Sequence, residues 1–131
     1  AQLLPLTGAV IVCTPQVVAQ DDARRAVSMF QQLGAPILGL VENMSYFVAD
    51  DGKEYDIFGR GGGEQMAAAK NLAFLGSIPI HPDMRIAADT GEPLKNWEIN
   101  DTMSKAFDTV CTNLSTAADS STPDRPTLTI H

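Results

Sequence analysis

Two short apolar runs separated by an amphipathic helix limit the possible folds of this chain more than any other feature. Residues 8–13 (GAVIVC) and 37–41 (ILGLV) show no polar alternation, which is typical of strands covered on both faces. Between them, the apolar side chains of residues 19–33 fall on one helical face, and Gly34 and Pro36 end that helix. A strand, a helix and a strand in this order predict a right-handed βαβ unit and therefore a parallel sheet.

The rest of the chain continues the same pattern. The further predicted elements are a hairpin of residues 46–48 and 55–58, a helix at about 62–70, a strand at 73–78, a short helix at 84–89 entered through His81-Pro82-Asp83, and a last helix from about residue 100. We therefore predict an α/β fold of three layers, α/β/α, with a mainly parallel sheet of three strands.

The domain boundaries follow from the same reading. Residues 1–118 are predicted to form one unit, and residues 119–131, which are polar and include two prolines, a mobile tail. The first strand begins close to Ala1 and has no predicted neighbour on one side, whereas strands of parallel sheets need neighbours and cover. We therefore expect this chain to be part of a longer domain.

Composition excludes several classes of function. Nine Lys and Arg against 16 Asp and Glu give a net charge of −7, so a nucleic-acid groove is not expected. The two cysteines, Cys13 and Cys111, are far apart, which favours neither a disulfide framework nor a zinc site and fits a reducing cytoplasm. No apolar run approaches about 18 residues, so no membrane span is predicted.

The end of the second strand is the first candidate site. Open α/β sheets bind ligands beyond the carboxyl ends of their strands, where Glu42, Asn43, Met44 and Ser45 lie; a plain connection is the alternative. The glycines at 61–63 are followed by Glu-Gln rather than by the lysine and hydroxyl of a phosphate-binding loop. We therefore interpret them as a tight, closely packed entry into a helix.

Five segments in order carry a family resemblance. They are TGAVIVCTPQ, DDARRAVSMF, APILGLVENMSYF, YDIFGRGGGEQMA and LGSIPIHPDMRIAADTGEP. Together they resemble the C-terminal half of Mrp/ApbC-type P-loop ATPases, which are iron–sulfur cluster carriers related to MinD, ParA and the nitrogenase iron protein. The resemblance implies a cytoplasmic homodimer that binds ATP with Mg and serves iron–sulfur apoprotein clients. It places the Walker A and Walker B segments before Ala1, so this chain alone is expected to be inactive, without catalytic or metal-ligating residues of its own.

The resemblance also assigns a base pocket. Asn43 matches the asparagine that reads the adenine edge, and its amide offers both a donor and an acceptor. Pro79, Ile80 and His81 match the segment that walls the same pocket, although His81 stands where an aspartate is common. The alternatives are that Asn43 only caps its loop and that His81 is a surface or capping residue. Nothing holds a phosphate near Glu42 or Asp83, so neither is assigned as a general base.

The carrier role depends on ligands that this sequence lacks. Cluster-carrying members have a Cys-x-x-Cys pair where this chain has Ala49-Asp50-Asp51-Gly52, and carboxylates replace soft thiolates poorly. A solvated turn is the expected role of the two acids. The rival hypothesis is a stand-alone, non-enzymatic α/β interaction module whose first strand is covered by a second copy or by a partner.

Overall fold

The computed structural model describes residues 6–121 and contains the predicted parallel sheet. Its strands are β1 (Ala9–Cys13), β2 (Ile37–Glu42) and β5 (Phe74–Ser77), in the order β1-β2-β5, with both pairings parallel. The central strand β2 is buried at every position after Ile37, which explains its unbroken apolar run. The predicted strands and their direction are confirmed.

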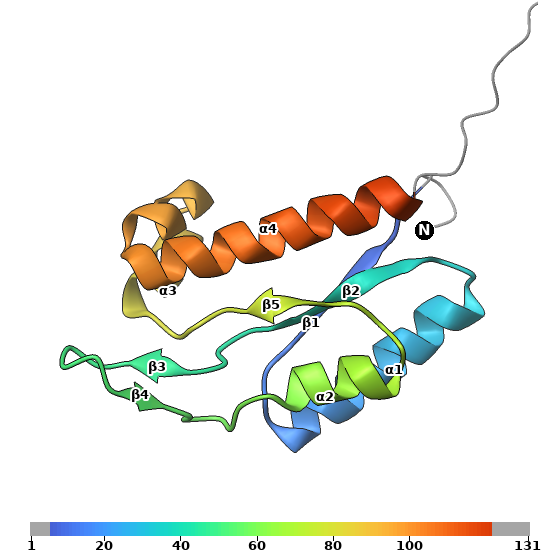
Figure 1. Cartoon of the computed structure of the whole chain (residues 1–131), viewed down its shortest axis with the longest axis horizontal. Coiled ribbons are helices and arrows are strands. Elements are labelled where there is room, and N and C mark those ends of the chain that lie inside the picture. Colours follow the sequence, from blue (N-terminus) through green and yellow to red (C-terminus); the bar gives the residue numbers. More distant parts are fainter. Residues whose placement is uncertain (1–5, 122–131) are drawn as a thin grey trace, which may run out of the picture.

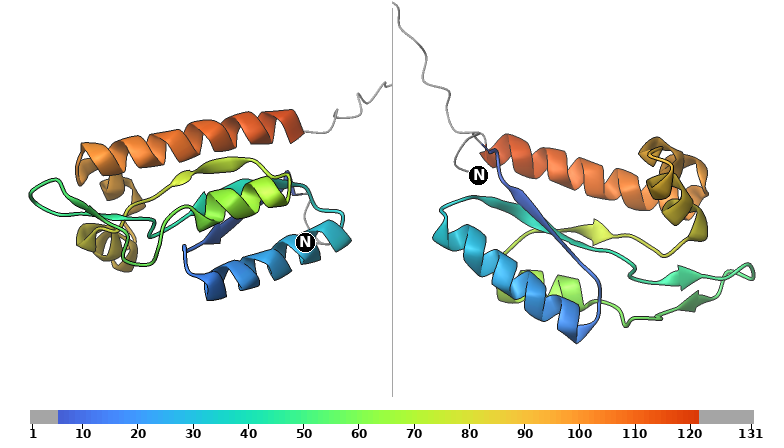
Figure 2. Two further views of the ribbon diagram at one scale, coloured as in Figure 1. Left: turned by 60° about the horizontal axis from the view of Figure 1, so that its bottom comes forward. Right: turned by 180° about the vertical axis from the view of Figure 1, so that it is seen from behind.

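Helices cover both faces of this sheet (Figures 1 and 2). Helices α1 (Val17–Gln32) and α2 (Gly62–Ala69) lie on one face, and α4 (Asp101–Ser121) lies on the other. One apolar core lies under α1 and α2 and includes Val27, Leu40 and Met66, and a second core under α4 includes Leu75 and Met103. The three-layer α/β/α architecture is therefore confirmed.

The remaining elements lie at one end of the sheet. They are the hairpin strands β3 (Phe47–Val48) and β4 (Glu54–Tyr55), the helix α3 (Pro82–Asp89) and the 3-10 helix η1 (Pro93–Glu98). The predicted hairpin is confirmed as an antiparallel pair. The 3-10 helix was not predicted; it packs against α4 through Trp97, whose ring lies 5.0 Å from that of Phe107 and whose Nε1–H donates to Asp108.

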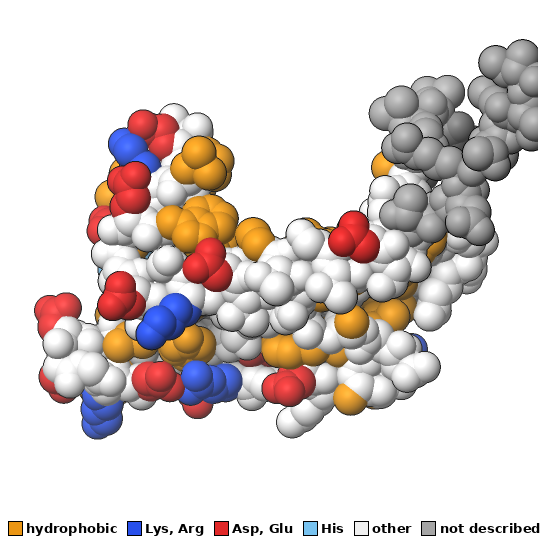
Figure 3. Space-filling view, turned by 45° about the horizontal axis from the view of Figure 1, so that its top comes forward, with side chains coloured by type: hydrophobic (Ala, Val, Ile, Leu, Met, Phe, Trp, Pro, Cys, Tyr) orange, Lys and Arg blue, Asp and Glu red, His pale blue; other side chains and the backbone are white. Residues whose placement is uncertain are grey.

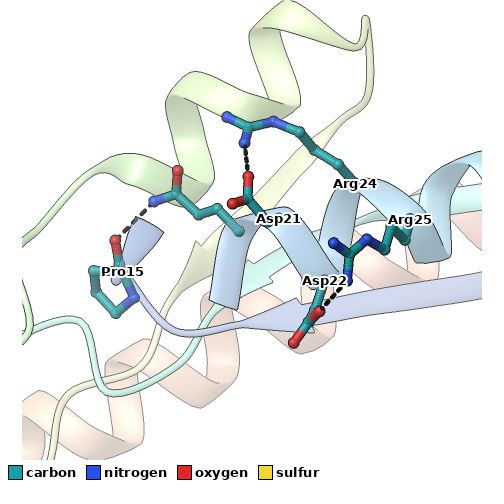
Figure 4. A network of polar contacts seen from close by, with 6 residues as sticks. Pro15, Asp21, Asp22, Arg24 and Arg25 are labelled. Carbon is teal, nitrogen blue, oxygen red and sulfur yellow. Dashed lines mark hydrogen bonds and ion pairs between the residues drawn. The ribbon is translucent and has the colours of Figure 1, made fainter. Parts of the chain in front are cut away.

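Three predicted helix boundaries were wrong, and one of them is the start of α3, which lies at Pro82 rather than at Met84. Helix α1 begins at Val17, two residues before the predicted start at Ala19. The prediction missed these two residues because Val17 and Val18 are exposed and add nothing to the apolar periodicity. Its first turns are held by polar contacts instead: Gln20 donates to the Pro15 carbonyl, and Asp21 pairs with Arg24 (Figure 4). Helix α4 continues three residues past position 118, where the polar tail was expected to begin, and residues 122–131 of that tail lie outside the described residues.

Strand β1 lies at an edge of the sheet. Within residues 6–121 it pairs only with β2, and Val12, the fourth of its five residues, is 60% exposed. An open trough of about 590 Å³ runs along this edge, between β1 and the apolar face of α1. Within the described residues, β1 therefore has a neighbouring strand on one side only.

Acidic and basic side chains are interspersed on the face of the molecule shown in Figure 3. Between residues 6 and 121, no helix combines the length and the apolar character needed to cross a bilayer.

Candidate functional site

The site is organised by the carboxylate of Glu42, the last residue of β2. This side chain is fully buried. Its Oε1 accepts hydrogen bonds from the Ser45 hydroxyl at 2.6 Å and the Gly61 amide at 3.0 Å, and its Oε2 accepts from the Gly63 amide at 2.6 Å. A buried carboxylate at a helix N-terminus is stabilised by such donors and by the helix dipole. Glu42 therefore anchors the start of α2 to the sheet and has no oxygen left without a donor.

The glycine cluster is required by the closeness of this contact. Gly61 caps α2 with a φ of +85°, a backbone conformation that favours glycine. A Cβ at Gly63 would lie 3.0 Å from the Glu42 carboxylate and 3.0 Å from Leu40, so a side chain there would press on the sheet. The interpretation of the cluster as a tight helix entry with close backbone packing is confirmed.

Asn43 begins the loop beyond β2. Its backbone amide donates to the Cys13 carbonyl at 2.7 Å, and its Oδ1 accepts from the Met44 amide at 2.9 Å. Met44 has a φ of +53°, an uncommon conformation for a non-glycine residue that often occurs at functional sites. The local contact that the capping alternative expects is therefore present, yet no residue between 6 and 121 accepts a hydrogen bond from Asn43 Nδ2.

The loop after β5 runs beside this segment. The Ser45 amide donates to the Ile78 carbonyl at 3.0 Å, and the Ile80 amide donates to the Tyr46 carbonyl at 2.7 Å. An isolated parallel bridge joins Ile80 to Phe47. These backbone contacts hold residues 79–81 opposite residues 43–47, because both loops leave neighbouring parallel strands at the same edge of the sheet.

A cleft of about 650 Å³ lies between these two loops and α3. All four residues predicted for the base pocket line it, namely Asn43, Pro79, Ile80 and His81. Its volume is within the range of small-molecule sites, and its lining is mostly apolar with a few polar groups, as such sites usually are. The structure thus brings together residues that lie almost 40 positions apart in the sequence.

Sequence reasoning placed Met44 at a candidate ligand site but missed half of the lining of this cleft. The missed residues are Phe58, Pro82, Met84, Arg85 and Ala88. Phe58 belongs to the end of the predicted hairpin segment, and its 37% exposure is a signal that only a structure provides. The others lie on or beside the predicted helix, but the helical pattern did not show which of its faces meets the loops.

Polar contacts hold the rim of the cleft. His81 is the N-cap of α3, and its Nδ1 accepts from the Asp83 amide at 3.1 Å. Arg85 forms an exposed ion pair with Asp89 at 2.7 Å. The capping alternative for His81 is thus observed together with its place in the cleft wall. The structure assigns no phosphate-binding loop to this rim.

The hairpin is fixed at its base and solvated at its tip. At its base, the Arg60 guanidinium lies 4.1 Å from the centre of the Tyr46 ring and 2.6 Å from Glu54, whose hydrogen bond is the largest cause of the raised pKa of Arg60. At its tip, Asp51 accepts from the Lys53 amide at 2.9 Å in an exposed turn. The expectation of a solvated acidic turn is therefore confirmed.

The described residues do not form a thiolate site for an iron–sulfur cluster. Cys13 is buried in β1 and Cys111 is exposed on α4. Burial, and to a smaller extent the charge of Glu42, raises the pKa of the Cys13 thiol, which disfavours the thiolate that a metal requires. Across residues 6–121, no group of three or more His, Cys, Asp or Glu side chains is placed to hold a metal ion.

Comparisons with known proteins agree with this fold. The iron–sulfur cluster carrier protein of Aquifex aeolicus is 44% identical over 121 residues, which are 92% of this chain and 33% of that protein. A nucleotide-binding protein of Archaeoglobus fulgidus, solved in complex with ADP, is 35% identical with a TM-score of 0.58, covering 66% of this chain and 36% of that one. The cell-division ATPase MinD of Pyrococcus furiosus shares the fold, with a TM-score of 0.64 at 19% identity over 84% of this chain and 43% of its own.

The matches cover only part of the length of each relative. The chain spans between about a quarter and a third of the length of the curated relatives it matches. A family model described as "ParA: NUBPL iron-transfer P-loop NTPase" matches residues 1–115, which is most of the chain. The chain therefore belongs to the ParA/NUBPL family of iron-transfer P-loop NTPases.

Proposed function

We propose that this chain supplies the base-binding part of the nucleotide site in an ATP-hydrolysing iron–sulfur cluster carrier. One observation carries the proposal: Asn43, Pro79, Ile80 and His81, which family resemblance selects from the sequence, all line one cleft of about 650 Å³, and Asn43 also borders the trough along β1. The Archaeoglobus relative, which was solved with ADP, supports a nucleotide as the ligand.

The chemistry of the cleft fits a purine. Pro79, Ile80, Phe58 and Met84 all contribute apolar side chains to its lining, and flat rings are stabilised by such desolvated contacts. The Asn43 Nδ2 atom has no acceptor among residues 6–121, so it is free to donate to a ring nitrogen. Its Oδ1 keeps a second lone pair that can accept from an exocyclic amine.

The phosphate end of the nucleotide requires residues that this chain lacks. The sequence contains no GxxxxGK[ST] segment, and Glu42, which stands beside the glycine cluster, makes the start of α2 unsuitable for a phosphate. We propose that the Walker A and Walker B segments, with Mg, lie in a preceding part of the same protein. Residues 1–118 would then be the C-terminal portion of its ATPase domain, and this chain alone does not hydrolyse ATP.

The open edge of β1 supports this division. A parallel strand with an exposed Val12 and an adjoining trough of about 590 Å³ suits a further strand, which would continue the sheet. We propose that the part bearing the phosphate-binding loop provides it, and that the complete cytoplasmic protein is a homodimer. The same edge also favours a second candidate function, a non-enzymatic interaction module in which another copy or a partner covers β1.

The cluster is cargo in this proposal, delivered to apoprotein clients. The carrier role rests on family membership and on similarity to named carrier proteins. Because the described residues offer no thiolate pair, any cluster ligands would come from outside residues 6–121 or from a client. The hairpin tip at residues 49–52 does not provide them.

Photolabelling with 8-azidoadenosine tests the proposed base site. We expect covalent labels in the peptides that contain Asn43 to Phe58 and Pro79 to Ala88, because both segments line the cleft. Excess adenosine should suppress them, whereas excess ribose 5-phosphate should not. Labels confined to residues 10–30 of β1 and α1, or labels that adenosine does not suppress, would contradict a base site in this cleft.

A further inference from the structure

We propose that Phe58 stacks on the base of the bound nucleotide and that Arg60 is the positioning residue that holds the Phe58 ring in the cleft. The inference rests on the proposed function and adds an aromatic platform to the base site. It concerns the segment that joins β4 to α2 (Figure 1), which contributed no residue to the predicted base pocket.

Phe58 presents an aromatic side chain to an apolar cleft. It supplies the only phenyl ring among the described residues that line the cleft, and it is 37% exposed. An aromatic side chain that stays in contact with water forgoes part of the stabilisation that its burial would provide. A base in the cleft can cover this ring, because purines stack on aromatic side chains through their flat faces.

The backbone holds Phe58 in a tight turn. The Gly59 amide donates to the Asp56 carbonyl at 3.1 Å, and an isolated bridge joins Ile57 to Gly59. Gly59 has a φ of +85°, a conformation that favours glycine. Phe58 is therefore the third residue of a four-residue turn, and its backbone has little freedom of its own.

Arg60 fastens this turn to its surroundings. Its guanidinium lies 2.6 Å from the Glu54 carboxylate and 3.6 Å from that of Asp56. It also lies 4.1 Å from the centre of the Tyr46 ring, which is a cation–π contact. The ion pair between Arg60 and Glu54 thus closes a loop that contains Phe58.

The same contacts connect the turn to the loop after β5. Tyr46, whose ring contacts Arg60, accepts a hydrogen bond from the Ile80 amide through its backbone carbonyl at 2.7 Å. Ile80 itself lines the cleft. Without the guanidinium, the turn keeps its own backbone hydrogen bond but loses its connection to this part of the cleft.

The exposure of Arg60 indicates that its contacts act locally. Its side chain is 41% exposed, and ion pairs of this kind contribute little to the stability of a whole domain. Loss of the contacts should therefore change how often the turn holds the Phe58 ring in place. Affinity falls in proportion to the fraction of molecules that are competent to bind.

Nuclear Overhauser contacts between the Phe58 ring and the base protons of adenosine test the stacking. We expect these contacts, together with upfield shifts of the base protons, because an aromatic ring shields protons that lie over its face. Phe58→Leu keeps an apolar side chain but removes the ring, so it should weaken adenosine binding about tenfold. A residue that only provided an apolar wall would tolerate leucine.

Substitutions of Arg60 test the positioning. Arg60→Gln should weaken adenosine binding about threefold, which corresponds to about a third of the molecules keeping the ring in place. Arg60→Lys keeps the charge but not the planar guanidinium, and should recover part of this loss. In a Phe58→Leu chain, Arg60→Gln should cause no further loss, because no ring is left to position.

Arg24→Gln is the matched control. Arg24 forms an ion pair of similar exposure with Asp21 on α1 (Figure 4), and neither residue lines the cleft. This variant should bind adenosine as the unmodified chain does and should keep the contacts between the base and Phe58.

The outcomes separate this inference from the proposed function. Adenosine that shifts the amides of Ile80 and Met84 without contacting Phe58, or that binds Phe58→Leu equally tightly, would overturn the stacking and leave the base site intact. An Arg60→Gln effect that is the same with and without the Phe58 ring would overturn the positioning role. Absence of adenosine binding to the unmodified chain would overturn both the inference and the proposed base site.

Discussion

Glu42→Gln should lower the free energy of unfolding by about 3 kcal/mol. This is at the upper end of the cost of leaving a buried polar group without its hydrogen-bond partner, because the lost hydrogen bonds are charge-assisted. The substitution keeps the size of the side chain but replaces one carboxylate oxygen with an NH2 donor. If the NH2 group takes the place of Oε2, it faces the Gly63 amide. If it takes the place of Oε1, it faces the Ser45 hydroxyl and the Gly61 amide. Either orientation leaves donors opposed in a fully buried place, so the start of α2 detaches from the sheet.

Urea unfolding followed by circular dichroism measures this effect. Glu64→Gln is the matched control, because Glu64 lies on the same helix but is exposed. It should change stability by no more than about 0.5 kcal/mol. Equal stabilities for the two variants would show that Glu42 does not anchor the glycine cluster.

Leu40→Ala should destabilise the chain by about 3 to 4 kcal/mol, within the range found for buried leucines. Leu40 is fully buried in the central strand and belongs to the core of α1 and α2. It also forms part of the surface that Gly63 approaches. Truncation therefore leaves a cavity beneath the site as well as in the core, and neighbours fixed in the sheet can fill it only in part.

Leu94→Ala is the control for this change, since it removes the same atoms from a side chain that is 77% exposed. Its effect should stay within about 0.5 kcal/mol. Both variants can be compared by thermal unfolding at one protein concentration. A Leu40→Ala chain as stable as Leu94→Ala would contradict the assignment of Leu40 to a close-packed core.

The sheet and its helices could be predicted because burial on both faces leaves a direct trace in the sequence. The runs at 8–13 and 37–41 have no alternation, and the structure places both in a parallel sheet. The hairpin followed from its Asp-Asp-Gly turn, which local geometry determines. Where side chains are exposed, as at Val17 and Val18, the hydrophobic pattern carries no signal and the boundary prediction was wrong.

The site could be predicted only in part. Family resemblance selected Asn43 and the loop at 79–81, and the structure places these residues in one cleft, while their binding of a base stays a prediction. The role of Glu42 was not recognised, because its amide partners Gly61 and Gly63 lie 19 and 21 residues further along the chain. In a sequence, a carboxylate at the end of a strand suggests a ligand site. Only the folded chain shows that the backbone amides of Gly61 and Gly63 donate hydrogen bonds to this carboxylate.

We propose that the cleft between Asn43, Ile80 and α3 holds the base of a nucleotide. The most direct measurement is a titration of the isotopically labelled chain with adenosine, followed through its backbone amide resonances. Adenosine carries the base without the phosphates, so no phosphate-binding loop is needed. With the base site alone, we expect a dissociation constant on the order of 1 mM, which corresponds to about −4 kcal/mol.

We expect the backbone amide resonances of residues that line the cleft to shift, including those of Met44, Phe58, Ile80 and Met84. The resonances of residues along the edge of β1 should not shift. Asn43→Ala should abolish most of these shifts, and ribose 5-phosphate should cause none in the unmodified chain. Shifts that appear only along β1, or an unchanged spectrum with millimolar adenosine, would contradict the claim that this cleft is a base site.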